Sequence, residues 1–260
     1  MTKGYDPRRR RFLTAGTAAL GTALLAGCDQ ISSAPWSRNI LGSAEMLTRA
    51  AQRLVLPRAA LAHEFDAADI SPVFRANGTV DPYEREYRAL ASGKFVDWRL
   101  TVDGLVDTPL SLSIDEVRAM PARSQITRHD CVEGWSCIGK WTGPELGPIL
   151  RGAGLRSNAR YLVFHCFDDP ERSRDGSGVY YESIDLIDAF HPQTILAHAL
   201  NDQPLRVAYG APLRLRVERQ LGYKMAKYLR RIEAVESFAN FGRGKGSYWA
   251  DRGYEWYAGI

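Results

Sequence analysis

The segment His129-Asp130-Cys131-Val132-Glu133-Gly134-Trp135-Ser136 is the most informative stretch of this sequence. It follows an extended run, Ser124–His129, so it predicts a cysteine thiol at the end of a β-strand with polar neighbours. A thiolate is a soft ligand that suits a redox metal in a sulfur-rich coordination sphere. The alternative is a buried structural thiol, because free cysteine is among the most buried residue types. Taken alone, the segment favours the structural thiol.

A second block lies downstream of Cys131. It consists of Gly210-Ala211-Pro212-Leu213-Arg214, followed by Gly222-Tyr223-Lys224 and Lys227. Together the two blocks resemble the molybdopterin-binding domain of the sulfite oxidase family, which includes the periplasmic methionine-sulfoxide reductase catalytic subunits. The resemblance covers residues 74–233, and its anchor regions follow the family's order. This combination favours a metal ligand at Cys131.

The resemblance implies a set of cofactor contacts. Cys131 corresponds to the thiolate that coordinates molybdenum, and Arg214 to an arginine that holds the pterin's phosphate through its guanidinium group. Met225-Ala226-Lys227 corresponds to a segment whose backbone amides and lysine hold the same phosphate. Asn77 corresponds to an asparagine that contacts the pterin, although an ordinary turn residue explains Asn77 nearly as well.

Two positions depart from the family's pattern. Cys166 stands where reductase relatives have a threonine, and Tyr209 stands where relatives have a histidine or an asparagine. A thiol is only a weak hydrogen-bond donor, and a phenol donates well but is longer than asparagine. We therefore expect the molybdenum-molybdopterin cofactor to be bound, with altered contacts at these two positions.

A solvated strand face is the alternative for the basic side chains of this region, since charged residues usually face water. The residues concerned are Arg214, Arg216, Lys224, Lys227, Arg230 and Arg231. The aromatic residues near the C-terminus have two explanations as well, internal packing or an access funnel, and packing is the simpler one. They include Tyr248, Trp249, Tyr254, Trp256 and Tyr257.

The N-terminus has the form of an export signal. Arg9–Leu13 matches a twin-arginine motif, and the thirteen residues Thr14–Ala26 carry no charge and are too few to span a bilayer. Leu25-Ala26-Gly27-Cys28 resembles a lipoprotein signal-peptidase site, so we expect residues 1–27 to be removed and Cys28 to be lipidated. A chance cysteine is the alternative. The mature protein would then be anchored on the periplasmic side of the membrane.

The charge of the chain resides in this leader. Residues 1–27 hold five basic and one acidic side chain, which accounts for the whole net charge of +4. The remainder is neutral, so no nucleic-acid surface is predicted. The cysteines form no Cys-x-x-Cys pair, which argues against a zinc ribbon or a thioredoxin-like site. A disulfide between Cys131 and Cys137 is conceivable in an exported protein, and it would exclude the metal-ligand role.

The pattern of expected elements favours an α+β fold with a single mixed-sheet domain at 58–260, preceded by a tether and N-terminal helix at 28–57. A capping box at Ser113–Glu116 predicts a helix start, and Asp103-Gly104 predicts a hairpin turn. Residues 58–94 show no period and are expected to be irregular. Strands are expected at 98–102, 124–129, 161–164, 194–198, 213–217 and 227–232, and helices at 43–56, 145–150 and 184–190.

These features predict a molybdenum-dependent oxidoreductase that performs two-electron oxygen-atom transfer on a small sulfoxide-like or sulfite-like substrate. Electrons would be exchanged singly with a separate partner, a membrane haem protein or a cytochrome. Reduction is favoured over oxidation. The alternatives are a lipoprotein that binds the cofactor without catalysis and a thiol-redox protein that uses Cys131, Cys137 and Cys166.

Overall fold

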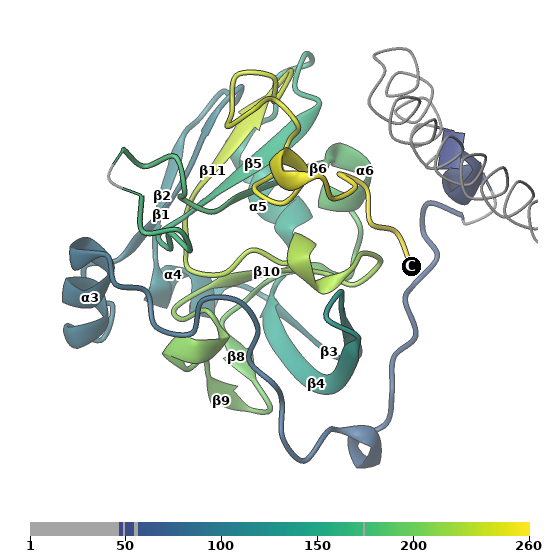
Figure 1. Ribbon diagram of the computed structural model, residues 1–260, viewed down its shortest axis with the longest axis vertical. Helices are drawn as coiled ribbons and strands as arrows, with labels where there is room; N and C mark the ends of the chain where they lie inside the picture. The colour runs from purple at the N-terminus through teal and green to yellow at the C-terminus, as the bar shows by residue number, and fades with distance from the viewer. Residues whose placement is uncertain (1–46, 49, 55–56, 174) are drawn as a thin grey trace, which may run out of the picture. The chain divides into compact units, whose positions relative to one another are not determined.

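Figure 1 shows the computed structural model, which describes residues 47–48, 50–54, 57–173 and 175–260. The chain divides into two units, Met1–Val55 and Leu56–Ile260. In the first unit the described residues are helical, as expected of the helix that precedes Pro57. The export signal, Cys28 and the tether lie outside the described residues, so those assignments stay predictions. Of the helices that are described, none has the length and apolar character needed to cross a bilayer.

The second unit is built around a five-stranded sheet with the strand order β2-β1-β11-β5-β6. β1 and β11 run parallel, and the other neighbours are antiparallel. Leu100 and Val102 of β1 are fully buried while their neighbours are not, which is the alternation of a strand with one apolar face. The sheet is therefore mixed, as the sequence predicted. Its strands are β1 (Arg99–Gly104), β2 (Leu110–Ser113), β5 (Tyr161–Cys166), β6 (Tyr181–Asp185) and β11 (Leu229–Val235).

A second group of strands carries the cysteine segment. β3 and β4 form a long antiparallel hairpin, which Figure 1 shows as a strongly curved teal ribbon, and β8 and β9 extend this sheet. β7 and β10 form a separate antiparallel pair. A smaller apolar cluster around Phe74 and Trp141 fills the space beside these strands. The bounds are β3 Ala122–Cys131, β4 Trp135–Pro144, β7 Thr194–Ala197, β8 Ala199–Leu200, β9 Gln203–Pro204 and β10 Arg214–Val217.

The helices are short. α4 begins with the predicted capping box, in which the Glu116 N–H donates to the Ser113 hydroxyl at 3.2 Å and the Ser113 N–H donates to the Glu116 carboxylate at 2.7 Å. α5 ends at Gly154, whose φ of +69° closes the helix. The helices are α3 Arg85–Ser92, α4 Ile114–Ala119, α5 Leu146–Ala153 and α6 Leu186–Ala189, and the 3₁₀ turns are η1 Ala67–Asp69, η2 Val207–Tyr209, η3 Gly222–Lys224 and η4 Ala250–Arg252.

Four local predictions are wrong in type or in bounds. The hairpin turn at Asp103-Gly104 does not form, because β1 continues through Gly104, which pairs with Ala234 of β11. The expected irregular stretch at 58–94 contains α3, whose apolar residues Tyr87, Leu90 and Ala91 lie at helical spacing and pack against the core. The helix expected at 184–190 is reduced to α6, since Ile184 belongs to β6. The last predicted strand begins at Leu229 rather than at residue 227.

Candidate active site

Cys131 is the last residue of β3 and lies opposite Trp135, the first residue of β4. The turn between them is tight, with Gly134 at φ +83° and its N–H donating to the Cys131 carbonyl at 3.0 Å. The side chain is partly buried, and this burial raises the pKa of the thiol, an effect that the Glu133 N–H opposes. Coordination to a metal ion would deprotonate the thiol. The strand end thus presents one thiol that remains accessible.

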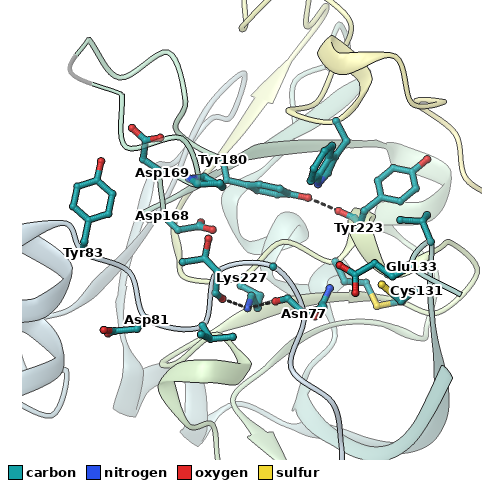
Figure 2. A pocket seen from close by; sticks show the side chains of 18 of the residues that line it. Asn77, Asp81, Tyr83, Cys131, Glu133, Asp168, Asp169, Tyr180, Tyr223 and Lys227 are labelled. Atoms are coloured by element: carbon teal, nitrogen blue, oxygen red, sulfur yellow. Dashed lines mark hydrogen bonds between the residues drawn. The ribbon is translucent and has the colours of Figure 1, made fainter. Parts of the chain in front are cut away.

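A cavity of about 610 Å³ opens beside this thiol, a volume typical of small-molecule sites. Figure 2 shows Cys131 and Glu133 together at one end of the cavity and Lys227 beside Asn77 in its middle. Met225 lines it as well. The other end is lined by acidic and aromatic side chains, Asp81, Tyr83, Asp168 and Asp169.

Lys227 reaches the cavity from the segment before β11. Its ammonium group donates to the carbonyls of Asn77 (2.7 Å), Ala208 (3.2 Å) and Thr79. Burial and, to a smaller extent, the charge of Arg214 lower the pKa of Lys227 to about 7, and Asp168 opposes this shift. Within the described residues no carboxylate lies at salt-bridge distance from this ammonium group.

Arg214, the first residue of β10, lies directly behind the cavity wall. It is 1% exposed, its guanidinium carbon lies 4.9 Å from the centre of the Trp141 ring, and it donates to the carbonyls of Tyr209 (3.1 Å) and Met225 (3.2 Å). Its Nε atom has no hydrogen-bond partner in the described part of the chain. Burial lowers the pKa of Arg214 to about 9, and the neighbouring charge of Arg216 adds to the effect.

Gly210 brings the two cations together. It has φ +103°, and a side-chain carbon at this position would lie 2.9 Å from Cβ of Lys227 and 3.3 Å from Cβ of Arg214. Any larger residue at position 210 would therefore push the two basic side chains apart. The glycine in the second sequence block thus has a specific structural role.

Four of the six residues in the predicted basic block are buried, and they differ in their partners. Arg216 pairs with Glu218 at 2.6 Å, and Lys224 pairs with Glu182, with all four side chains fully buried. Arg214 and Lys227 have no such carboxylate among the described residues. An unpaired buried cation is costly, so this pair is suited to an anion that enters from outside the chain. The solvated-face alternative is wrong for these four residues and holds only for Arg230 and Arg231, which are at least partly exposed.

The structure separates the predicted site residues into two groups. Asn77, Cys131, Met225 and Lys227 line the cavity. The remaining ones do not line it: Cys166, Tyr209, Arg214 and Ala226.

Two members of the second group have contacts that explain their position. Cys166 is 1% exposed, and burial raises the pKa of its thiol well above the usual value. Tyr209 donates from its hydroxyl to the Phe74 carbonyl at 2.8 Å, so this phenol binds the segment that leads to Asn77. The length of the phenol, noted in the sequence, allows this contact.

Asp168 is a candidate site residue that the sequence did not single out. It lines the cavity, is 4% exposed, and its Oδ1 atom has no hydrogen-bond partner within the described residues. Burial raises the pKa of Asp168 to about 7, and Lys227 opposes the shift. The only signal in the sequence is a pair of acids, Asp168-Asp169, directly after a strand.

The disulfide alternative does not fit the strand register. Cys131, Cys137 and Cys166 are all free thiols. Cys137 lies opposite His129 and Cys131 opposite Trp135, so the two cysteines are diagonal neighbours across the hairpin. Diagonal residues have Cα atoms about 7–8 Å apart, beyond the usual span of a disulfide.

Comparison of the sequence with known proteins gives one matching family and relatives that carry names. The family described as "Oxidoreductase molybdopterin binding domain" matches residues 89–240, more than half of the chain. The chain belongs to this family. It is 34% identical over 97% of its length to YedZ1 of Azospira oryzae, provisionally named a protein-methionine-sulfoxide reductase subunit, and covers 88% of that protein. It is 33% identical over 89% of its length to the protein-methionine-sulfoxide reductase catalytic subunit MsrP of Xanthomonas axonopodis pv. citri, covering 70% of it.

Among solved structures, the sulfane dehydrogenase SoxCD of Paracoccus pantotrophus aligns with a TM-score of 0.48 at 20% identity, over 55% of this chain and 39% of that one. The family assignment rests on the sequence matches. The chain is therefore a molybdopterin oxidoreductase, as the sequence predicted, and its cofactor is molybdopterin.

The residues of the cavity fit this cofactor. The accessible thiol of Cys131 offers a soft ligand for the metal. The unpaired cations Arg214 and Lys227 offer charge to a phosphate group, and the open Nε atom of Arg214 leaves a donor for it. The carboxyl of Asp168 offers an acceptor at the far end of the cavity.

Proposed function

We propose that this molybdopterin oxidoreductase reduces a sulfoxide of the methionine-sulfoxide type. The observation that carries the proposal is the open cavity with the Cys131 thiol at one end, Lys227 in its lining and Arg214 behind it. Neither of these two cations has a carboxylate partner among the described residues. The names of the relatives in Azospira and Xanthomonas support the direction of the reaction. In this reaction the S–O bond breaks, the substrate takes up two electrons and two protons, and a thioether and water leave.

In this proposal each cavity residue has one task. Cys131 binds the metal as a thiolate, and Arg214 and Lys227 hold the phosphate of the cofactor. Asn77 contacts the pterin from the segment that Lys227 and Tyr209 hold in place. When bound, the cofactor supplies two-electron oxygen-atom exchange, while the protein supplies orientation and charge. The packing of Arg214 on Trp141 fixes the direction of its guanidinium group before the phosphate arrives.

The two electrons come from a separate partner in this proposal, each in a one-electron step. We assign this role to a membrane haem protein or a cytochrome. The relatives are named as subunits, which supports a reductase that works with a partner. A haem partner predicts that reduced cytochrome is reoxidised by the protein only when a sulfoxide is present.

The test is a comparison of both reaction directions in protein purified from a host that makes the cofactor. We expect molybdenum in the protein, reduction of methionine sulfoxide with a reduced viologen dye, and slower oxidation of sulfite with ferricyanide. Faster sulfite oxidation would reverse the proposed direction. Molybdenum-loaded protein without either activity would instead support a cofactor-binding lipoprotein without catalysis.

Replacement of Cys28 by alanine tests the proposed location, a lipid-anchored protein on the periplasmic side exported by the twin-arginine route. Two acyl chains on one residue are enough for stable anchoring. We expect the wild-type protein in the membrane fraction and the Cys28→Ala protein in the soluble periplasmic fraction, or as uncleaved precursor. Mass spectrometry of the mature N-terminus checks the cleavage site. A soluble wild-type protein that begins at another residue would contradict the lipidation.

A further inference from the structure

The C-terminal segment gives the cavity an aromatic wall. Trp249 and Tyr254 line the cavity together with Tyr223 of η3. The rings of Trp249 and Tyr254 have centroids 5.0 Å apart, and Tyr223 meets Tyr254 edge-on at 5.4 Å. We call these three residues the aromatic lip. The packing explanation from the sequence holds for Tyr248 and Trp256, which are buried, but not for Trp249 and Tyr254.

One residue of the aromatic lip, Tyr223, lies near the Cys131 end of the cavity. Gly222, next to Tyr223, packs against the strand that carries Cys131, and a Cβ at position 222 would lie 2.4 Å from the His129 ring and 3.1 Å from the Asp130 carbonyl. Figure 2 shows Tyr223 on the same side as Cys131 and Glu133 and away from the acidic end. Tyr223 therefore lies on the side of the thiol, and Tyr254 and Trp249 continue the aromatic contacts from it.

Hydrogen bonds and an ion pair hold the chain segments that carry the aromatic lip. The Tyr254 N–H donates to the Trp249 carbonyl at 3.1 Å, across a turn that Gly253 makes with φ +98°. The Tyr223 hydroxyl donates to the Glu255 carbonyl at 2.6 Å. Arg252, inside the turn, also pairs with Glu171. These contacts join the turn that carries Trp249 and Tyr254 to Tyr223 and to Glu171.

The mouth of the cavity near Cys131 is apolar on two sides. Tyr254 of the aromatic lip is 41% exposed and Val132 of the cysteine turn is 43% exposed, and both line the cavity. Tyr223 is only 8% exposed, so the aromatic surface runs from solvent into the cavity. A substrate that reaches Cys131 by this route passes an aromatic ring and a branched aliphatic side chain.

We propose that Trp249 and Tyr254 are specificity-determining residues that select substrates whose sulfur carries alkyl groups. Aromatic rings make favourable contacts with polarizable sulfur and with methyl and methylene groups. These contacts hold the alkyl groups at the aromatic lip while the oxygen on sulfur points to the Cys131 end. An inorganic oxyanion has no alkyl group and gains nothing from them. This inference rests on the proposed sulfoxide reduction.

The test compares Trp249→Ala and Tyr254→Ala with the wild-type protein, each loaded with cofactor, on methionine sulfoxide and on dimethyl sulfoxide. We expect KM for methionine sulfoxide to rise about tenfold, the effect of losing a few apolar groups from a pocket, with kcat changed less than about twofold. The rise is smaller for dimethyl sulfoxide, which has fewer methylene groups to contact the rings. Trp249→Phe keeps an aromatic ring and restores most of the affinity.

A control and a binding measurement separate this inference from the proposed function. Phe190→Ala is the matched control, because Phe190 is 40% exposed but does not line the cavity, and KM stays unchanged. Binding of methionine sulfoxide is also followed by tryptophan fluorescence. We expect the fluorescence of the wild-type protein to change on binding and that of Trp249→Phe to stay unchanged. An unchanged KM in both alanine variants overturns the inference, as does a loss of molybdenum parallel to the loss of activity. If the wild-type protein binds methionine sulfoxide at Trp249 but does not reduce it, the proposed function alone is overturned. If the wild-type protein shows no binding and no turnover, both the proposed function and this inference are overturned.

Discussion

Replacing Cys131 with serine is expected to abolish turnover while the protein stays folded. A hydroxyl is a hard and weakly acidic ligand, so it changes the electronic properties of the metal far more than the volume of the site. We expect turnover per bound molybdenum to fall by more than about 100-fold. Changes to residues that only support a metal ligand cost up to about this much, and Cys131 is the ligand itself in this proposal. The β3–β4 pairing at Cys131 is made by backbone atoms, so the melting temperature changes little. Turnover per bound molybdenum, with metal content measured on the same sample, checks this expectation.

Cys137→Ser is the control for this variant. Cys137 is 9% exposed, accepts a hydrogen bond from the Arg75 N–H at 3.4 Å, and does not line the cavity. We expect it to keep the wild-type turnover per molybdenum. Wild-type turnover in Cys131→Ser would rule out this cysteine as the metal ligand. Equal losses in both variants would point to the thiol-redox alternative.

Replacing Arg214 with alanine is expected to remove the cofactor much more than it slows the cofactor that stays bound. A buried phosphate needs charge-assisted donors, and loss of one costs on the order of 2–5 kcal/mol of binding free energy. This corresponds to a decrease in affinity of roughly 30-fold to several thousand-fold. Molybdenum content after gel filtration and turnover per bound molybdenum are the two measurements. Full molybdenum content in Arg214→Ala would contradict the phosphate assignment.

Arg214→Met shows whether such a loss reflects misfolding. Methionine keeps most of the contact with Trp141 and removes a buried charge that has no carboxylate partner among the described residues. Replacing an uncompensated buried charge with an apolar group is neutral or stabilising. We therefore expect the cofactor-free Arg214→Met protein to melt at or above the wild-type temperature, although it fails to retain molybdenum. Arg230→Ala, which removes a surface arginine, leaves both properties unchanged.

The sequence predicted the elements whose signals are local. The alternation in β1, the extended run of β3 and the capping box of α4 depend on neighbouring residues, and all three are present. Such local patterns do not predict which distant segments pair with each other. Gly104 looked like a turn residue, but its Cβ would lie 2.3 Å from the Ala234 carbonyl, so it is a glycine because β11 packs there.

The candidate site was predicted through its cysteine and its basic block, and the burial of that block could not be predicted. The sequence assigned Arg214 and Lys227 to the phosphate through the resemblance and left a solvated face as the alternative, since nothing local tells which cation is enclosed. Asp168 was missed for the same reason, because a carboxyl is usually exposed and this one becomes a cavity residue only through the fold. Tyr209 was expected to touch the cofactor, yet its hydroxyl reaches a carbonyl of a segment far away in the sequence.

The contacts of Lys227 have a consequence for how the cofactor is acquired. An ammonium group has three hydrogens to donate, and Lys227 already donates to three backbone carbonyls, those of Asn77, Thr79 and Ala208. A phosphate oxygen that accepts a hydrogen bond from Lys227 must displace one of these carbonyls. Loading is then an exchange of hydrogen-bond partners at Lys227, and the measured affinity for the cofactor includes the difference between the new bond and the old one.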